Sequence, residues 1–352
     1  MIVADFRKII KNREMGNFTF KGLFLAGLFM VLGCLSIQAA DDDGLITKQI
    51  TIKLEKAGTL PDKIGSTKKK QITNLKIIGE INGTDLRMIR EMAGRDVNGR
   101  GTDGMLSVLD LSDAKIVEGG DYYYFNGHSD YYILTGHNDC FTSNDKIGDS
   151  AFESCSGLTS ITLPSGVTEI GKFAFLHCSG LTSITLPSGL TEISSSAFSG
   201  CSGLTSITLP SGVTMIYSSA FESCSGLTSI ALPSGLTEIG VNAFSGCSGL
   251  TSIYVYAEKL PNMGSDVFDG CDAKKCTVYV PKGTYDDYWL SEFGYFENIV
   301  EFEATGINNV VTSNDAKELS RYSVNGQRLS APTKGLNIVK YSDGSVKKVA
   351  VQ

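Results

Sequence analysis

The chain repeats itself every 23 residues through much of its second half. Four residue types, Cys, Phe, Ala and Ile, recur at this spacing. The columns are Cys155, Cys178, Cys201, Cys224 and Cys247; Phe152, Phe175, Phe198, Phe221 and Phe244; Ala151, Ala174, Ala197, Ala220 and Ala243; and Ile161, Ile184, Ile207, Ile230 and Ile253. A unit this short cannot bury a core of its own, so successive units must stack on one another. The sequence therefore predicts a solenoid with one continuous core.

One part of each unit alternates as a strand does. Ile161 and Leu163 lie two residues apart and point to one face, whereas Ser160 and Thr162 point to the other. Pro164 has no backbone donor and ends the strand. The outward columns are Ser160, Ser183, Ser206, Ser229 and Ser252, and Thr162, Thr185, Thr208, Ala231 and Tyr254. We expect a mostly β solenoid, a parallel ladder of 23-residue coils, whose outward columns either bind protein or glycan or only keep the surface soluble.

The consensus I-G-x-x-A-F-x-x-C-x-x-L-x-x-I-x-L-P-x-x-V-x-x-I runs from Ile147 to Ile170 and continues to Ile253. It resembles the BspA-like (Treponema-type) leucine-rich repeat of bacterial surface proteins. The segment from Cys276 to Val300 resembles the cap that closes such arrays, so residues 139–302 are expected to hold the repeats and this cap. The resemblance implies an adhesin-like binding protein that engages a protein or glycan on host, matrix or other cells. A structural envelope spacer, or a component that self-assembles, is the alternative.

Residues 41–138 are expected to form an N-terminal cap with irregular repeats. Ile50–Leu54 and Leu106–Leu111 have the alternation of strands. Thr84–Gly94 has the pattern of a helix that is capped by Thr84 or Asp85 and stopped by Gly94. Such a helix-bearing cap would cover the apolar face of the first coil.

Within this region, residues 119–139 are predicted to form an aromatic loop. Tyrosine combines a rigid apolar ring with a polar tip, a combination typical of binding surfaces. These side chains either contact a partner or pack on the solenoid and shield its entry. They are Tyr122, Tyr123, Tyr124, Phe125, Tyr131 and Tyr132.

Residues 1–40 have the pattern of an export signal. Basic side chains precede the apolar run Gly22–Ile37, and small residues follow it. Cleavage after those small residues would release the protein. Alternatively, Val31–Cys34 resembles a bacterial lipobox, and Cys34 would carry a lipid. The protein is therefore expected to be secreted or associated with the cell surface or outer membrane, and to contact membranes only through this signal or a lipid.

Residues 303–352 differ from the repeats and are predicted to form short β segments joined by turns. This tail resembles the C-terminal sorting or attachment tails of Gram-negative anaerobes with type IX secretion. A small β module without a sorting role is the other interpretation.

The chain carries no recognisable catalytic, nucleotide-binding or metalloprotease motif. It has three histidines, His128, His137 and His177, and no C-x-x-C pair. The net charge of −7 without a basic stripe argues against nucleic acid as a partner. We therefore expect a protein that is not an enzyme and needs no cofactor or metal ion.

The aligned cysteines are interpreted as small buried apolar groups, with disulfides between neighbouring coils as the alternative. Cys271 and Cys276 fall outside the strict spacing and are the better disulfide candidates in an exported protein. The acidic triplet Asp266, Asp269 and Asp272 is interpreted as a solvated turn rather than a calcium site.

Overall fold

The structure is a computed structural model of the chain. It describes residues 44–125 and 139–302, and the backbone of four strands at 318–323, 328–329, 335–341 and 346–351. The predicted export signal with Cys34, and the predicted binding residues Tyr131 and Tyr132, lie outside the described residues.

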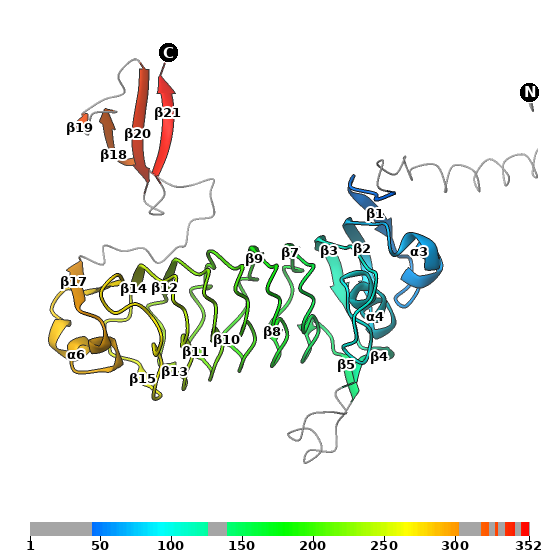
Figure 1. Cartoon of the computed structure of the whole chain (residues 1–352), viewed down its shortest axis with the longest axis horizontal. Helices are drawn as coiled ribbons and strands as arrows, with labels where there is room; N and C mark the ends of the chain where they lie inside the picture. The colour runs from blue at the N-terminus through cyan, green and yellow to red at the C-terminus, as the bar shows by residue number, and fades with distance from the viewer. Residues whose placement is uncertain are drawn as a thin grey trace, which may run out of the picture. The chain divides into compact units, whose positions relative to one another are not determined.

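Parallel strands run through the array and form its first ladder (Figure 1). One sheet has the order β1-β2-β3-β7-β9 and another the order β12-β14-β16-β17, and a bridge joins Ser206 to Ser229 at the start of the second. The strands are β1 (Ile50–Lys53), β2 (Asn74–Ile81), β3 (Val108–Ile116), β7 (Ser160–Thr162), β9 (Ser183–Thr185), β12 (Ser229–Leu232), β14 (Ser252–Val255), β16 (Thr277–Pro281) and β17 (Asn298–Phe302). The predicted parallel ladder is confirmed. The predicted strands at Ile50–Leu54 and Leu106–Leu111 correspond to β1 and β3.

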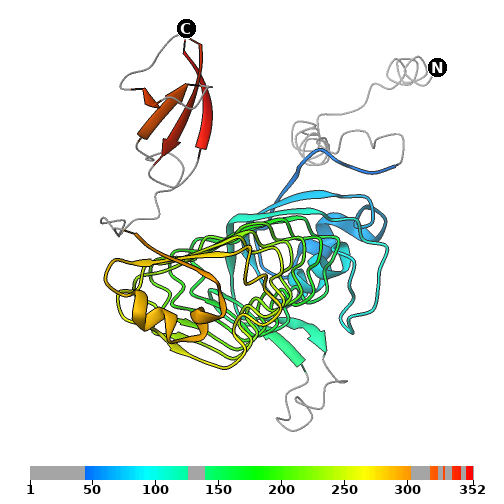
Figure 2. The ribbon, with the colours of Figure 1, turned by 60° about the vertical axis from the view of Figure 1, so that its left-hand side comes forward.

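The first ladder forms one side of each coil, and two further sides close the coil. Figure 2 shows successive coils superimposed when they are viewed closer to the direction of stacking. The second side consists of two-residue strands in two parallel sheets, and within each sheet the inward Ile or Met of each strand is in register with that of its neighbour. These strands are β6 (Lys146–Ile147), β8 (Glu169–Ile170), β10 (Glu192–Ile193), β11 (Met215–Ile216), β13 (Glu238–Ile239) and β15 (Asn262–Met263). On the third side the backbone N–H of Phe152 donates to the carbonyl of Ala174 at 2.7 Å, and this bond recurs through the repeats.

The core is built from columns of identical side chains. Phenylalanine rings stack from Phe152 to Phe268 with centroids 5.2–5.9 Å apart and nearly parallel planes. Beside them the cysteine thiols from Cys178 to Cys271 each donate to the phenylalanine carbonyl of the preceding coil, as Cys224 does to Phe198 at 3.1 Å. Both columns are fully buried through the five regular units. Each coil therefore covers the apolar face of the coil before it, which a single unit could not do alone.

The N-terminal cap contains two helices, α3 (Leu60–Lys68) and α4 (Gly83–Met92). Helix α4 confirms the predicted helix, but its N-cap is Asn82, not Thr84 or Asp85. Gly83 begins the helix because the carbonyl of Asp121 would lie 1.9 Å from a Cβ atom at that position. The buried carboxylate of Asp85 instead accepts backbone N–H groups at the start of α3 and at Asn82.

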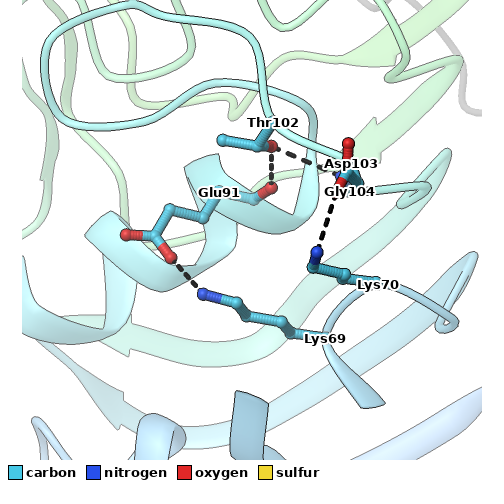
Figure 3. A network of polar contacts seen from close by, with 6 residues as sticks. All are labelled: Lys69, Lys70, Glu91, Thr102, Asp103 and Gly104. Atoms are coloured by element: carbon cyan, nitrogen blue, oxygen red, sulfur yellow. Dashed lines mark hydrogen bonds and ion pairs between the residues drawn. The ribbon is translucent and has the colours of Figure 1, made fainter. Parts of the chain in front are cut away.

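A network of polar contacts joins the segment after α3 to α4 and the following loop (Figure 3). Lys69 pairs with Glu91 at 2.6 Å between Nζ and Oε2, and Lys70 pairs with Asp103 at 2.8 Å. The hydroxyl of Thr102 donates to the backbone carbonyl of Glu91 at 2.6 Å. These contacts account for the short basic run after α3 and hold the cap together on its solvent side.

Arg90 connects this cap to the first repeat. Its guanidinium is fully buried, lies 4.5 Å from the centroid of the Tyr124 ring, and donates to the carbonyls of Ser150 and Ala151 at 2.7 and 3.0 Å. The contact with an aromatic face and two carbonyls lowers the cost of burying this charge. Arg90 of the cap therefore binds the backbone at the beginning of the first coil.

The C-terminal cap contains α6 (Tyr285–Trp289) and a 3-10 turn, η1 (Glu292–Tyr295). Phe293 and Phe296 pack on Phe268 and end the stacked column. The hydroxyl of Tyr288 donates to the carbonyl of Ala257 at 2.7 Å. The aromatic segment predicted to close the array therefore does so.

The tail forms an antiparallel sheet of its own with the order β19-β18-β20-β21. Its strands are β18 (Glu318–Ser323), β19 (Arg328–Leu329), β20 (Gly335–Tyr341) and β21 (Val346–Val351). The predicted β character of the tail is thus confirmed. Within the residues that the structure describes, no helix has the length and apolar character needed to span a bilayer.

Candidate binding surface

The outer face of the first ladder carries two columns of hydroxyl groups, opposite the buried isoleucines. Ser160 aligns with Ser183 and Thr162 with Thr185 in the parallel register of β7 and β9. The predicted residues Ser160, Thr162, Ser183, Thr185, Ser206, Thr208 and Ser229 are all half-buried or exposed. Neighbouring coils are spaced about 4.8 Å apart, so the face offers a pair of hydroxyls at that interval.

These hydroxyls differ from the other threonines of the same coils. Thr182 and Thr251 each donate to the carbonyl of the aligned threonine in the preceding coil, at 3.0 and 3.1 Å. No hydrogen bond is made, within the described parts of the chain, by the hydroxyls of the seven residues on the outer face. Their donors and acceptors are therefore available to water or to a ligand.

The C-terminal end of this face is aromatic. Tyr254 and Tyr279 lie in register on β14 and β16, with ring centroids 4.6 Å apart and planes within 7° of parallel. Next to them Tyr256 meets Phe302 edge to face at 5.5 Å. We call Tyr254, Tyr256, Tyr279 and Phe302 the aromatic platform. Val300, which is 45% exposed, borders it in register with Tyr279.

A step separates the hydroxyl columns from the platform. Ala231 pairs with Tyr254 in the register of β12 and β14. One face of the Tyr254 ring is covered by Tyr279, whereas the other looks along the ladder over the methyl group of Ala231. A coil spacing of about 4.8 Å leaves this second face without a stacked ring. At this point of the surface the Tyr254 ring projects from the sheet beside the small neutral side chains of the preceding coils.

A group of paired charges lies at the N-terminal end of the same face. Lys76 pairs with Asp110 at 3.1 Å and with Asp113 at 2.7 Å. The hydrogen bonds to Asp113 and Asp110 raise the pKa of Lys76 above its ordinary value. The single positive charge of Lys76 is therefore shared by two carboxylates, and the Ser, Thr and Ala side chains of the hydroxyl columns and the Ala231 step that follow are uncharged.

The described part of the predicted aromatic loop, residues 119–125, is a strand, and it buries two of the predicted binding residues. β4 (Gly119–Phe125) pairs with β5 (Asp139–Thr142), and Tyr123 and Tyr124 are buried. The Tyr123 hydroxyl donates to the carbonyl of Asp149 at 2.8 Å, and desolvation raises the pKa of Tyr124 above its ordinary value. A strand that alternates against α4 and the first coil buries the tyrosines that a loop would expose.

The remaining members of this group are not fully buried. Tyr122 lies beneath Arg87, with 5.5 Å from the guanidinium carbon to the ring centroid, and is half-buried, as is Phe125. Phe141 on β5 meets Tyr122 edge to face and is 53% exposed. Tyr122 and Phe125 thus remain candidates at the surface, whereas Tyr123 and Tyr124 pack on the solenoid and shield its entry.

Cys271 and Cys276, the candidates for a disulfide, are both free thiols in the structure. Cys271 continues the buried cysteine column and directs its Sγ to the carbonyl of Phe244 at 3.4 Å. Cys276 is buried just before β16. The repeat cysteines are likewise free, so the interpretation as small buried groups holds and the coils are not joined by disulfides.

Metal-binding groups do not gather in the part of the chain that the structure describes. In residues 44–125 and 139–302 no cluster of three or more His, Cys, Asp or Glu side chains is placed to hold a metal ion. Asp266, Asp269 and Asp272 are exposed, and Asp272 accepts the backbone N–H groups of Lys274 and Lys275. This is the solvated acidic turn that we expect. His128 and His137 lie outside the described residues.

The coils, ladders and buried columns define a leucine-rich-repeat solenoid. Within it, residues 145–275 match in six copies the family model of the BspA type leucine rich repeat region. No curated protein matches the chain.

Several solved structures are similar to part of the chain. A leucine-rich repeat protein of T. pallidum is 31% identical over 38% of this chain and 66% of its own, with a TM-score of 0.31. A leucine-rich cell surface protein of Faecalibacterium prausnitzii is 23% identical over 60% and 50%, with a TM-score of 0.32. A leucine-rich repeat protein of Bacteroides ovatus is 24% identical over 47% and 61%, with a TM-score of 0.28. The chain spans less than two thirds of each of these proteins.

Proposed function

We propose that this chain is an exported binding protein of the bacterial envelope, adhesin-like in role, that holds a protein or glycan ligand on the outer face of its first ladder. The observation that carries the proposal is the pair of hydroxyl columns without internal partners, which leads to the aromatic platform. A repeating row of available donors and acceptors suits a partner that is itself extended. Rings at one end add apolar area to which a partner can anchor.

The core and the caps support a role in binding rather than in catalysis. The thiols of the repeats are buried and strongly desolvated, which raises the pKa of Cys224 to about 12, so they are not available as nucleophiles. The surface that remains available is pre-formed, because the strands beneath it lie in two parallel sheets and the phenylalanines beneath it are stacked. A pre-formed face loses little conformational entropy on binding.

The test is a binding survey of the mature protein on arrays of glycans and of extracellular-matrix and cell-surface proteins. A triple variant, Thr162→Lys, Thr185→Lys and Thr208→Lys, places three charged side chains on the outer face. Its matched control is Ser165→Lys, Ser188→Lys and Ser211→Lys, at exposed turn positions of the same three coils. We expect the first variant to lose the ligand and the control to keep it.

Two results would contradict the proposal. Equal binding by both triple variants would place the ligand elsewhere on the chain. Self-association without any foreign ligand, detected by light scattering, would favour a structural envelope component instead.

Export is the second part of the proposal, and it rests on the pattern of residues 1–40. Mass spectrometry of the protein from its native cells should show a chain that begins near residue 40 or a lipid on Cys34. The same measurement should show whether residues 303–352 are removed, as a sorting tail would be. An intact, unmodified N-terminus would rule out both forms of export.

A further inference from the structure

The Ala231 step lies where the hydroxyl columns meet the aromatic platform. Four coils of the array carry a polar or aromatic residue at this position, Thr162, Thr185, Thr208 and Tyr254, and only the coil next to Tyr254 carries alanine. A threonine or a larger side chain at 231 would cover the ring. The methyl group leaves the second face of Tyr254 open toward the columns.

We infer that this step is a saccharide subsite, in which the flat apolar face of one sugar ring stacks on Tyr254 over Ala231. The inference rests on the proposed function and narrows the ligand to a neutral, unbranched glycan. Pyranose rings carry C–H groups on their faces and hydroxyls around their rims. The Tyr254 ring complements the C–H groups, and the neighbouring free hydroxyls of the protein complement the hydroxyls of the sugar.

The hydroxyl columns would meet the rim of the stacked sugar. The Tyr254 ring stacks on Tyr279 along the ladder, so the plane of this ring, and of a sugar stacked on it, lies across the ladder. Ser206 and Ser229 are joined by the bridge between their coils, so their hydroxyls follow one another at the coil spacing of about 4.8 Å. The sugar would therefore lie between the Tyr254 ring and the hydroxyls of Ser206 and Thr208, in the coil before Ala231.

The charge of the site selects between ligand classes. The side chains at the step and along the next coils are Ser, Thr, Ala and Tyr, and the charged group at the far end, Lys76, is already paired with two carboxylates. Acidic glycans and charged peptides would find no counter-charge here. A neutral polysaccharide needs no counter-charge to bind at this site.

The experiment is calorimetric titration of the full mature chain with neutral cello-, manno- and malto-oligosaccharides of graded length and with acidic oligosaccharides of matching length. We expect one neutral series to bind, with affinity that does not change with salt. Ala231→Tyr should extend the ring stack and abolish binding. Tyr254→Ala should weaken binding about tenfold or more, and Tyr254→Phe should keep it.

The control variant is Tyr217→Ala, which removes a half-buried tyrosine that directly follows β11, on the second side of its coil. Circular dichroism and thermal unfolding of each variant show that the fold is retained. Because Ala231 and Tyr254 face outward, their replacement leaves the buried columns unchanged.

The two proposals fail separately. If a protein ligand binds and is lost in the threonine-to-lysine variant, but no neutral glycan binds, the outer face is a binding surface and the saccharide subsite is wrong. If a neutral glycan binds equally to Ala231→Tyr and to the wild type, the site lies elsewhere. If neither class of ligand binds, both proposals fail.

Discussion

Two residues in every regular coil have a left-handed backbone, with φ between 53° and 75°. At the second of these positions the coils use Ser154, His177, Gly200, Ser223 and Gly246. The left-handed conformation raises the free energy of an L-residue by about 1 kcal/mol, whereas glycine adopts it without this cost. The mixture of residues explains why the repeat pattern did not reveal the position: the conformation is imposed by the stacking of coils, not by a constant residue.

Replacing Ser223 with glycine should therefore stabilise the protein by about 1 kcal/mol. Denaturant unfolding monitored by circular dichroism measures the change. The matched control is Ser225→Gly, two residues on, where the backbone does not have positive φ and glycine should stabilise nothing. Equal stabilisation by both variants would show that the left-handed strain is not the cause.

Stability at alkaline pH should depend on the cysteine column. Burial raises the pKa of Cys271 to about 11 and of Cys224 to about 12, from an ordinary value of 9.0. Above pH 9 the unfolded chain ionises these thiols while the folded chain does not. Each thiol therefore contributes fully below pH 9, and that contribution declines by about 1.4 kcal/mol per pH unit up to its folded pKa.

Unfolding free energies measured between pH 8 and pH 11 should fall less steeply in Cys224→Ala than in the wild type. The alanine variant should also be less stable at pH 8, because a buried group and its hydrogen bond to Phe198 are lost. Parallel pH profiles for the two proteins would mean that Cys224 does not titrate on unfolding.

At the scale of elements, the sequence predicts most of the N-terminal cap but not how α4 and β4 pack on each other and on the first coil. The pattern of Leu86, Ile89 and Ala93 correctly places α4, and all three are buried. Its start is missed because Gly83, ordinarily a poor helix residue, is required there by the close approach of β4. Tyr123 and Tyr124 were assigned to a loop because glycine and aspartate surround them, although the strand β4 buries them against the first coil.

Asp85 joins the two helices of the cap, and its carboxylate should be required for their arrangement. Oδ1 accepts the N–H of Leu60 at 2.8 Å, and Oδ2 accepts the N–H of Asn82 at 3.0 Å. Asp85→Asn should destabilise the protein by about 2 kcal/mol, because an amide cannot accept at both ends. Hydrogen exchange should show faster opening of α3, whereas Asp62→Asn, on the exposed side of α3, should leave exchange unchanged.

For the molecule as a whole, we expect the array to tolerate the loss of one complete coil but not of part of a coil. Removing the 23 residues from Ser202 to Cys224 joins Cys201 to Ser225 and restores every column. We expect this deletion variant to fold with a smaller denaturant m-value, since it buries less surface. Removing about half as many residues from the same point should prevent folding, because the phenylalanine and cysteine columns then fall out of register. Folding of both variants would contradict the stacking of coils in strict register.

The candidate site could be predicted only in part from the sequence. The serine and threonine columns follow from equal spacing alone, and the break at Ala231 and Tyr254 is visible in the same alignment. Tyr279 and Tyr256 were missed as partners. The step from Tyr254 to Tyr279 is 25 residues, and only the ladder shows that the two rings are in register.

The Ala231 step stands next to the C-terminal cap, whereas the paired charges stand next to the N-terminal cap, and nearly interchangeable coils fill the distance between them. Recombination between such similar gene segments would lengthen or shorten that distance by about 4.8 Å per coil while leaving both ends as they are. A lineage could in this way change the distance between the sugar-binding step and the paired charges without altering either contact.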